Sequence, residues 1–201
     1  MSLCLSITAA ELSVTRDVFA IIGTVGALVI GIIGLSTWRR QLYGTSKFQV
    51  AKNILTATYR IQDAIQAVRS PVLHLNREEV EAGRRLEEEQ RTYLERLQRV
   101  NEQRAELRML SLEAKAIWGD DGQECFQPIH ELIGNLHAAI WLHFWLKGAY
   151  AGPGVTVDRS PERVAANDKI VYYINDNDEF SQKVAQAVRG VEDVYQRRLR
   201  K

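Results

Sequence analysis

The sequence predicts an all-α protein with one N-terminal transmembrane helix followed by a helical bundle. Three observations lead to this class. Residues 18–38 form an unbroken apolar run, apolar residues after it recur at helical spacing, and residues 76–118 alternate Arg and Glu densely. We divide the chain into an extracytoplasmic tail (1–17), a transmembrane helix (18–38) and a cytoplasmic helical domain (39–201).

The apolar run has the length of a membrane span. It contains no ionisable side chain and ends directly at Arg39-Arg40. About 20 residues at a rise of about 1.5 Å each match a hydrocarbon core of about 30 Å. A cleaved signal peptide would carry a basic n-region and a small-residue cleavage site, and the sequence shows neither here. We therefore expect the lipid bilayer to be a partner of this chain.

The charges beside the span predict its orientation. The basic residues that follow it are Arg39, Arg40, Lys47 and Lys52, whereas Arg16 is the one basic residue before it. Lys and Arg are retained on the cytoplasmic side. The N-terminus is therefore expected outside and the C-terminus in the cytoplasm, in the inner membrane of a bacterium. Trp38, with Arg39 and Arg40, is placed at the membrane interface.

Small residues gather on one face of the span. At 100° per residue, Gly23, Ala27, Gly31 and Gly34 lie close together around the helix. Transmembrane helices associate where small residues let their backbones approach. The pattern predicts a homo-oligomer, with these four residues at the contact.

The first helix of the soluble domain is expected over residues 48–68. Its apolar positions alternate spacings of four and three, and they are Val50, Ile54, Ala57, Ile61, Ala64 and Val68. Pro71 should end it, because the residue before a proline avoids helical geometry. Residues 44–46 offer a break between the span and this helix, although one continuous helix fits as well.

Two further helices should complete most of the core. Asn76 is suited to cap a long charged helix that runs to about Trp118, stabilised by Arg–Glu pairs along its faces. Residues 127–149 form the most apolar segment of the soluble part, and Pro128 suits the first turn of a helix. We interpret this segment as the central core helix.

The C-terminal part combines a break with a last helix. Two short β-branched or aromatic runs between residues 155 and 174 could pair as a small β-hairpin. Asp178 then caps an amphipathic helix with Phe180, Val184 and Val191 on one face. Arg197–Lys201 end this helix, where cations complement its dipole.

Composition argues against several function classes. The net charge is +1, so no bulk basicity favours nucleic acid as a partner. His130, His137 and His143 are seven and six residues apart, which does not provide the i,i+4 pair of a zinc helix. The acidic turn 175–179 lacks the glycine and glutamate positions of a calcium loop. We predict no metal site and no cofactor.

One pair of residues suggests catalysis. Arg69 and His74 are separated by four residues, and this spacing resembles the motif of HEPN-type helical domains, several of which are ribonucleases. The resemblance implies that Arg69 binds phosphate and that His74 acts as general acid or base. Alternatively, Arg69 is a cation at the end of a helix and His74 a loop residue.

A broader resemblance covers the layout of the chain. The stretch from Trp38-Arg39-Arg40-Gln41-Leu42 through Tyr59-Arg60 to Arg69 resembles a group of bacterial single-pass membrane proteins with a helical cytoplasmic domain. More loosely, the layout resembles the membrane-associated accessory effectors of type VI CRISPR systems, which implies ring-shaped oligomers and antiviral defence. Our leading hypothesis is a non-enzymatic, self-associating membrane protein of this kind. The alternatives are a membrane-tethered HEPN-like ribonuclease and a scaffold that recruits a soluble protein partner.

Overall fold

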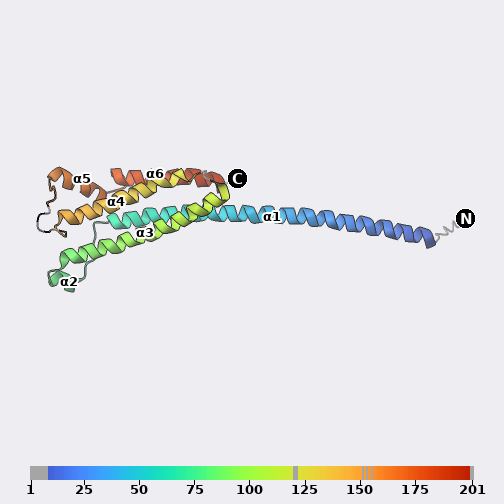
Figure 1. Ribbon diagram of the computed structural model, residues 1–201, viewed down its shortest axis with the longest axis horizontal. Helices are drawn as coiled ribbons and strands as arrows, with labels where there is room; N and C mark the ends of the chain where they lie inside the picture. The colour runs from blue at the N-terminus through green and yellow to red at the C-terminus, as the bar shows by residue number, and fades with distance from the viewer. Residues whose placement is uncertain (1–8, 120–121, 151, 153, 155, 200–201) are drawn as a thin grey trace. The chain divides into compact units, whose positions relative to one another are not determined.

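A computed structural model describes residues 9–119, 122–150, 152, 154 and 156–199, with side chains from Phe19 onward. All regular elements in these residues are helical, which confirms the all-α class (Figure 1). The contacts within the chain divide it into two units, Met1–Ser46 and Lys47–Lys201.

The first unit contains the N-terminal part of α1 (Ala9–Arg69). The helix continues through residues 44–46, so the uninterrupted helix is the alternative observed. From Phe19 onward it is long and apolar enough to cross a membrane, with a mean hydropathy of 2.3 over its most apolar 18 residues. None of those 18 residues is buried.

The second unit begins with the remainder of α1, which packs into the core. The buried residues of this part are Val50, Ala51, Ile54, Ala57, Ile61, Ile65 and Val68. The predicted stripe is confirmed except at Ala64, which is half-buried, because Ile65 fills the core at that turn. α1 ends at Arg69, two residues before Pro71, as expected.

The predicted helix over residues 76–118 is two helices, α2 (Arg77–Glu81) and α3 (Arg85–Trp118). Asn76 caps α2 as expected and accepts a hydrogen bond from the Glu78 N–H at 2.9 Å. The prediction of one helix is wrong because Gly83 adopts φ +81°, a left-handed conformation that ends α2.

After the 3-10 turn η1 (Glu124–Phe126), α4 (Gln127–Leu146) has Pro128 in its first turn, as the sequence indicates. It ends three residues before the expected Ala149, and Gly148 follows with φ +89°. Its buried apolar residues are Ile129, Leu132, Ile133, Leu136, Ala139, Ile140 and Phe144. Trp141 departs from this face, with 55% of its surface exposed.

The predicted β-hairpin is wrong for the residues that the structure describes. Residues 161–171 form α5 (Pro161–Val171), and Tyr172 ends it in an extended conformation. Pro161 occupies the first turn, where its missing N–H costs nothing, and Val171 is buried. Val155, part of the first predicted strand, lies outside the described residues.

The last helix is α6 (Glu179–Leu199). Asp178 caps it as predicted, because its Oδ1 accepts the Ser181 N–H at 2.8 Å. The buried face is the expected one and comprises Phe180, Val184, Ala187, Val188, Val191 and Tyr195. The basic end is helical as far as Leu199, and residues 200–201 lie outside the described part.

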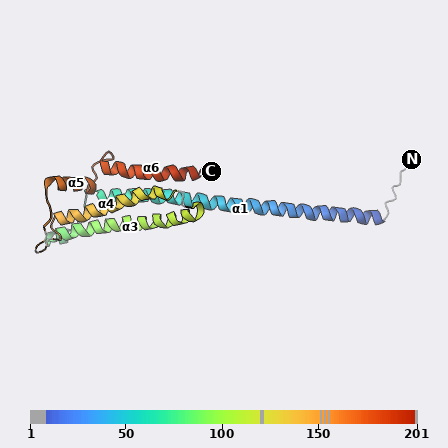
Figure 2. The same cartoon turned by 45° about the horizontal axis from the view of Figure 1, so that its top comes forward.

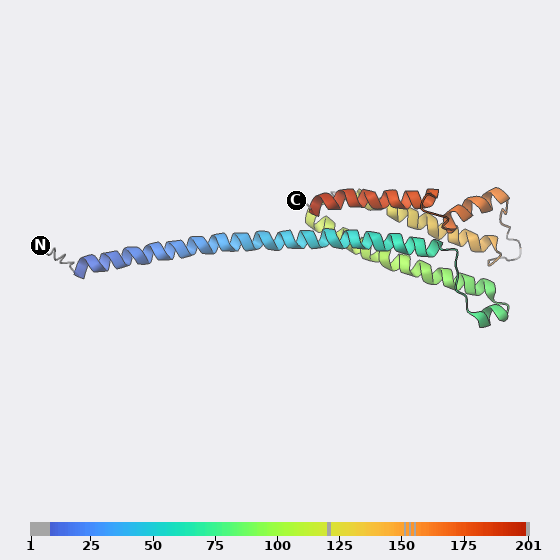
Figure 3. The same cartoon turned by 180° about the vertical axis from the view of Figure 1, so that it is seen from behind.

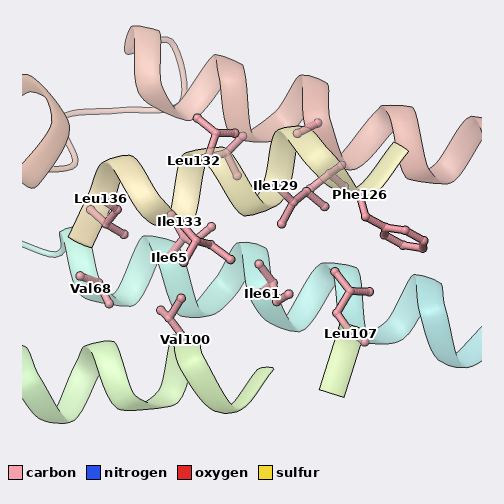
Figure 4. Packing of buried hydrophobic residues seen from close by; sticks show 14 of the residues in the cluster. Ile61, Ile65, Val68, Val100, Leu107, Phe126, Ile129, Leu132, Ile133 and Leu136 are labelled. Atoms are coloured by element: carbon pink, nitrogen blue, oxygen red, sulfur yellow. The ribbon is translucent and has the colours of Figure 1, made fainter. Parts of the chain in front are cut away.

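Within the second unit, the C-terminal part of α1 lies beside α3, α4 and α6 (Figures 2 and 3). The α3–α4 connection and the end of α6 meet at one end of this bundle, and α2 and α5 lie at the other (Figures 1 and 3). In the core, Ile65 and Val68 of α1 point toward residues of α3 and α4 (Figure 4).

Candidate functional site

The first candidate region is the apolar surface of α1. Its large side chains are exposed along the whole stretch: Phe19, Ile21, Ile22, Val25, Leu28, Val29, Ile30, Ile32, Ile33 and Leu35. Exposed fractions reach 74% at Phe19. The hydroxyl of Thr24, a polar side chain in this stretch, donates to the Ala20 carbonyl at 2.8 Å, so it needs no outside partner. The region presents an uncharged surface on every side of the helix.

The small-residue face lies open. Gly23, Ala27, Gly31 and Gly34 are all exposed. A Cβ atom added at any of the three glycines would meet no atom within 4 Å. Another helix can therefore approach this face closely.

The residues placed at the membrane interface are also exposed. Trp38 has 60% of its surface exposed, and Arg39 and Arg40 lie beside it. Neither arginine forms an ion pair with any residue that the structure describes.

Arg69 connects several segments of the second unit. It is the last residue of α1 and only 1% exposed. Its Nε donates to the carbonyl of Ile170 at 2.7 Å, and its Nη2 donates to those of Lys169 and Tyr172 at 3.0 and 2.9 Å. The last carbonyls of a helix lack partners within that helix. The guanidinium therefore caps the end of α5.

The same guanidinium also binds the start of α6. Nη2 lies 3.0 Å from Asp178 Oδ1, Nη1 donates to Ser181 Oγ at 2.8 Å, and the Phe180 ring lies 4.7 Å from Cζ. Burial opposes ionisation of Asp178, but the Ser181 N–H and the Arg69 guanidinium lower the pKa of its carboxyl. Arg69 therefore joins the ends of three helices.

His74 lies apart from this network. It is an exposed residue of the loop between α1 and α2, and it lines a cavity of about 340 Å³ with Arg96 and Arg99. Arg69 lines a different cavity of about 260 Å³. The structure does not bring the two residues of the predicted catalytic pair into one site, and the donors of Arg69 are already bound within the protein.

A second polar cluster, which the sequence analysis did not find, surrounds His143. This residue is 5% exposed, and its Nε2 lies 3.5 Å from the Tyr172 hydroxyl. Its Nδ1 is 4.0 Å from Asp168 Oδ1. Burial, and then the charge of Lys147, lower the pKa of His143. The neighbouring Tyr93 hydroxyl is buried without a partner, and burial raises its pKa to about 12. Only a tertiary structure brings these residues of α3, α4 and α5 together.

The three histidines of α4, one buried and two half-buried, predict a pH-dependent stability. Burial, as the largest cause, lowers the pKa of His130, His137 and His143 from the ordinary 6.5. Below pH 6.5 the unfolded chain binds protons that the folded chain does not yet bind. The free energy of unfolding is therefore fully retained above about pH 6.5 and falls as the pH drops through the lower folded pKa values, by up to about 1.4 kcal/mol per pH unit for each histidine.

Chemical denaturation in detergent at a series of pH values measures this effect. His143→Gln should make the free energy of unfolding less dependent on pH, because it removes one of the three titrating groups. If the free energy of unfolding falls equally steeply as the pH drops in wild type and in His143→Gln, then a lowered pKa of His143 does not contribute to the effect.

The described residues contain no group of three His, Cys, Asp or Glu side chains that could hold a metal ion. The acidic turn 175–179 serves the fold instead, since Asp178 caps α6 and binds Arg69. Cys125 donates to the Gly122 carbonyl, and burial raises the pKa of its thiol to about 11.

No protein-family model, curated protein or solved structure matches this chain.

Proposed function

We propose that the chain is a single-pass membrane protein that carries a helical cytoplasmic domain. The observation that supports this most directly is the complete exposure of the apolar stretch of α1. Burying one large aliphatic side chain is worth about 1.5–3 kcal/mol, so a stretch of ten or more exposed ones requires an apolar surrounding. A core helix of a soluble protein obtains it by burial in its own fold, whereas none of the 18 most apolar residues of this helix is buried. A bilayer would supply it.

We propose the bacterial inner membrane as the location, with the N-terminus outside. The support is the charge asymmetry of the sequence, with Arg39, Arg40, Lys47 and Lys52 on one side of the span. Arg39 and Arg40 are exposed and free to face lipid headgroups from the cytoplasmic side.

Self-association through the span is the proposed mode of action. Lipid tails are as apolar as the helix, so association depends on close packing, which the face of Gly23, Ala27 and Gly31 allows. The resemblance to membrane-associated CRISPR effectors supports an antiviral role for the assembly. A defence role predicts that the assembly perturbs the membrane on a signal.

Replacing Ala27 and Gly31 together with Leu tests the contact. The larger side chains would hold neighbouring backbones apart, so the yield of cross-linked oligomer in native membranes is expected to fall several-fold. Lys47 and Lys52 follow the span and are exposed, and they provide the targets for an amine-reactive reagent.

The matched control replaces Val25 and Ile32, which lie on the opposite side of the helix, with Leu. It should leave the oligomer yield unchanged. If the Ala27 and Gly31 variant cross-links as well as wild type, the span serves only as an anchor.

A further inference from the structure

A polar cavity of about 480 Å³ lies between α3 and α4, close to the connection that joins them. α3 contributes Arg104, Arg108 and Ser111, α4 contributes Gln127 and His130, and Gln123 lies on the connection. The cavity belongs to the second unit and is independent of the membrane span.

The two arginines of this cavity differ from Arg85 and Arg91 in the first part of α3. Arg85 and Arg91 each pair with a glutamate three or four residues away on the same helix. Arg104 and Arg108 are one turn apart, and the sequence places no carboxylate three or four residues from either one. Neither forms an ion pair among the described residues. Like charges at this spacing repel, so the fold concentrates positive charge on the α3 wall of this cavity.

The facing wall contains one polar side chain with an unpaired atom. His130 lines the cavity, and its buried Nδ1 makes no hydrogen bond in the structure. Buried polar atoms are almost always paired, so each exception calls for an explanation. Burial, then the charges of Arg104 and Arg108, lower the pKa of His130, which leaves a neutral ring that can donate one N–H.

One acidic residue also lines the cavity. The carboxylate of Glu131 accepts the Gln127 amide at 2.9 Å, so it has a partner of its own. The cavity therefore combines two guanidinium groups with an imidazole, a set suited to an anion with several oxygens.

We propose that this cavity binds a phosphate group, with Arg104 and Arg108 on its oxygens and His130 as a further donor. The volume falls in the range of small-molecule sites and has room for an organic group attached to the phosphate. A soluble phosphorylated molecule and a phospholipid headgroup share this chemistry. The site gives the protein a means to respond to a phosphorylated ligand.

The test uses the full chain in detergent micelles, with inorganic pyrophosphate as the soluble probe. Calorimetry should detect binding, and the bound anion should raise the pKa of His130 in NMR spectra of ring-labelled histidine. His143 lies at the other end of α4, so its pKa should not change and serves as an internal reference. Arg104→Gln and Arg108→Gln should each weaken binding about tenfold or more.

The control removes two exposed arginines elsewhere, Arg77→Gln with Arg84→Gln, and should bind as wild type. A second arm uses nanodiscs with phosphatidylglycerol. If pyrophosphate binds and the Arg104→Gln and Arg108→Gln variants weaken that binding, the result supports a soluble ligand. If the two substitutions weaken only the binding of phosphatidylglycerol in nanodiscs, the result supports a lipid headgroup. The proposal is overturned if neither probe binds, or if the Gln variants bind both as tightly as wild type does. Either result leaves the proposed membrane span untested, because the readout is the effect of substitutions at Arg104 and Arg108, which lie outside the span.

Discussion

Replacing Arg69 with Met is expected to lower the free energy of unfolding by about 3–5 kcal/mol, the usual cost of removing one partner of a buried ion pair. Methionine fills much of the same volume but donates nothing. The carbonyls of Lys169, Ile170 and Tyr172 would lose their donor, and the carboxylate of Asp178 would lose its cation. The end of α5 and the start of α6 would both be released.

Denaturation of the full chain in mild detergent, followed by tryptophan fluorescence, measures this loss. The control is Arg60→Met, since Arg60 is exposed and makes one ion pair, with Glu106 at 3.3 Å. Exposed pairs of this kind contribute about 0–1 kcal/mol. If Arg69→Met costs no more than the control, the network around Arg69 does not stabilise the fold, and a role in ligand binding becomes the better explanation for this residue.

Introducing arginine at both Leu28 and Val29 is expected to prevent insertion of the span. Each arginine at the centre of a membrane helix raises the free energy of insertion by about 2.5–3.5 kcal/mol. The leucine and valine that are replaced also no longer contribute their small favourable free energies of insertion. Both residues are exposed in α1, so no fold contact is lost and the effect should be confined to the membrane step.

Labelling of Cys4 with a membrane-impermeant thiol reagent provides the measurement. In intact cells wild type should be labelled, because the tail is expected outside, and the double variant should not be. Cys125 contributes little, because burial raises the pKa of its thiol to about 11. The control adds the same two charges at Leu42 and Tyr43, beyond Arg39-Arg40, and should label normally.

Two outcomes of this experiment would count against the proposed function. If wild-type Cys4 reacts only after the cells are permeabilised, the orientation is wrong. If the variant with arginines at positions 28 and 29 is labelled like wild type, the apolar stretch does not cross the membrane.

Residues that act on nearby backbone groups predict the helix ends correctly. Pro71 and the caps Asn76 and Asp178 mark helix ends as predicted, because each acts on backbone groups within a few residues. Gly83 is also a local signal, since its left-handed backbone (φ +81°) divides the predicted helix over residues 76–118 into α2 and α3.

In the C-terminal half, two predictions are wrong because packing between helices decides the outcome. Ile170 and Val171 have β-branched side chains typical of strands, yet they end α5, where Val171 is completely buried in the core. Packing outweighs β-propensity, which depends strongly on context. Trp141 is part of an apolar helix, but it stacks near Trp145 and Tyr150 on the surface instead of entering the core.

The sequence by itself determined the apolar span, the all-α class and the helix faces, because chain length and periodicity act along a single helix. Only the tertiary structure decided the partners of the charged and polar side chains. Arg69 binds a carbonyl 101 positions away, and Arg104 and His130 meet across two helices. A side chain finds such partners only after the core has brought distant segments together. The spacing of Arg69 and His74 along the chain therefore could not show that they line separate cavities.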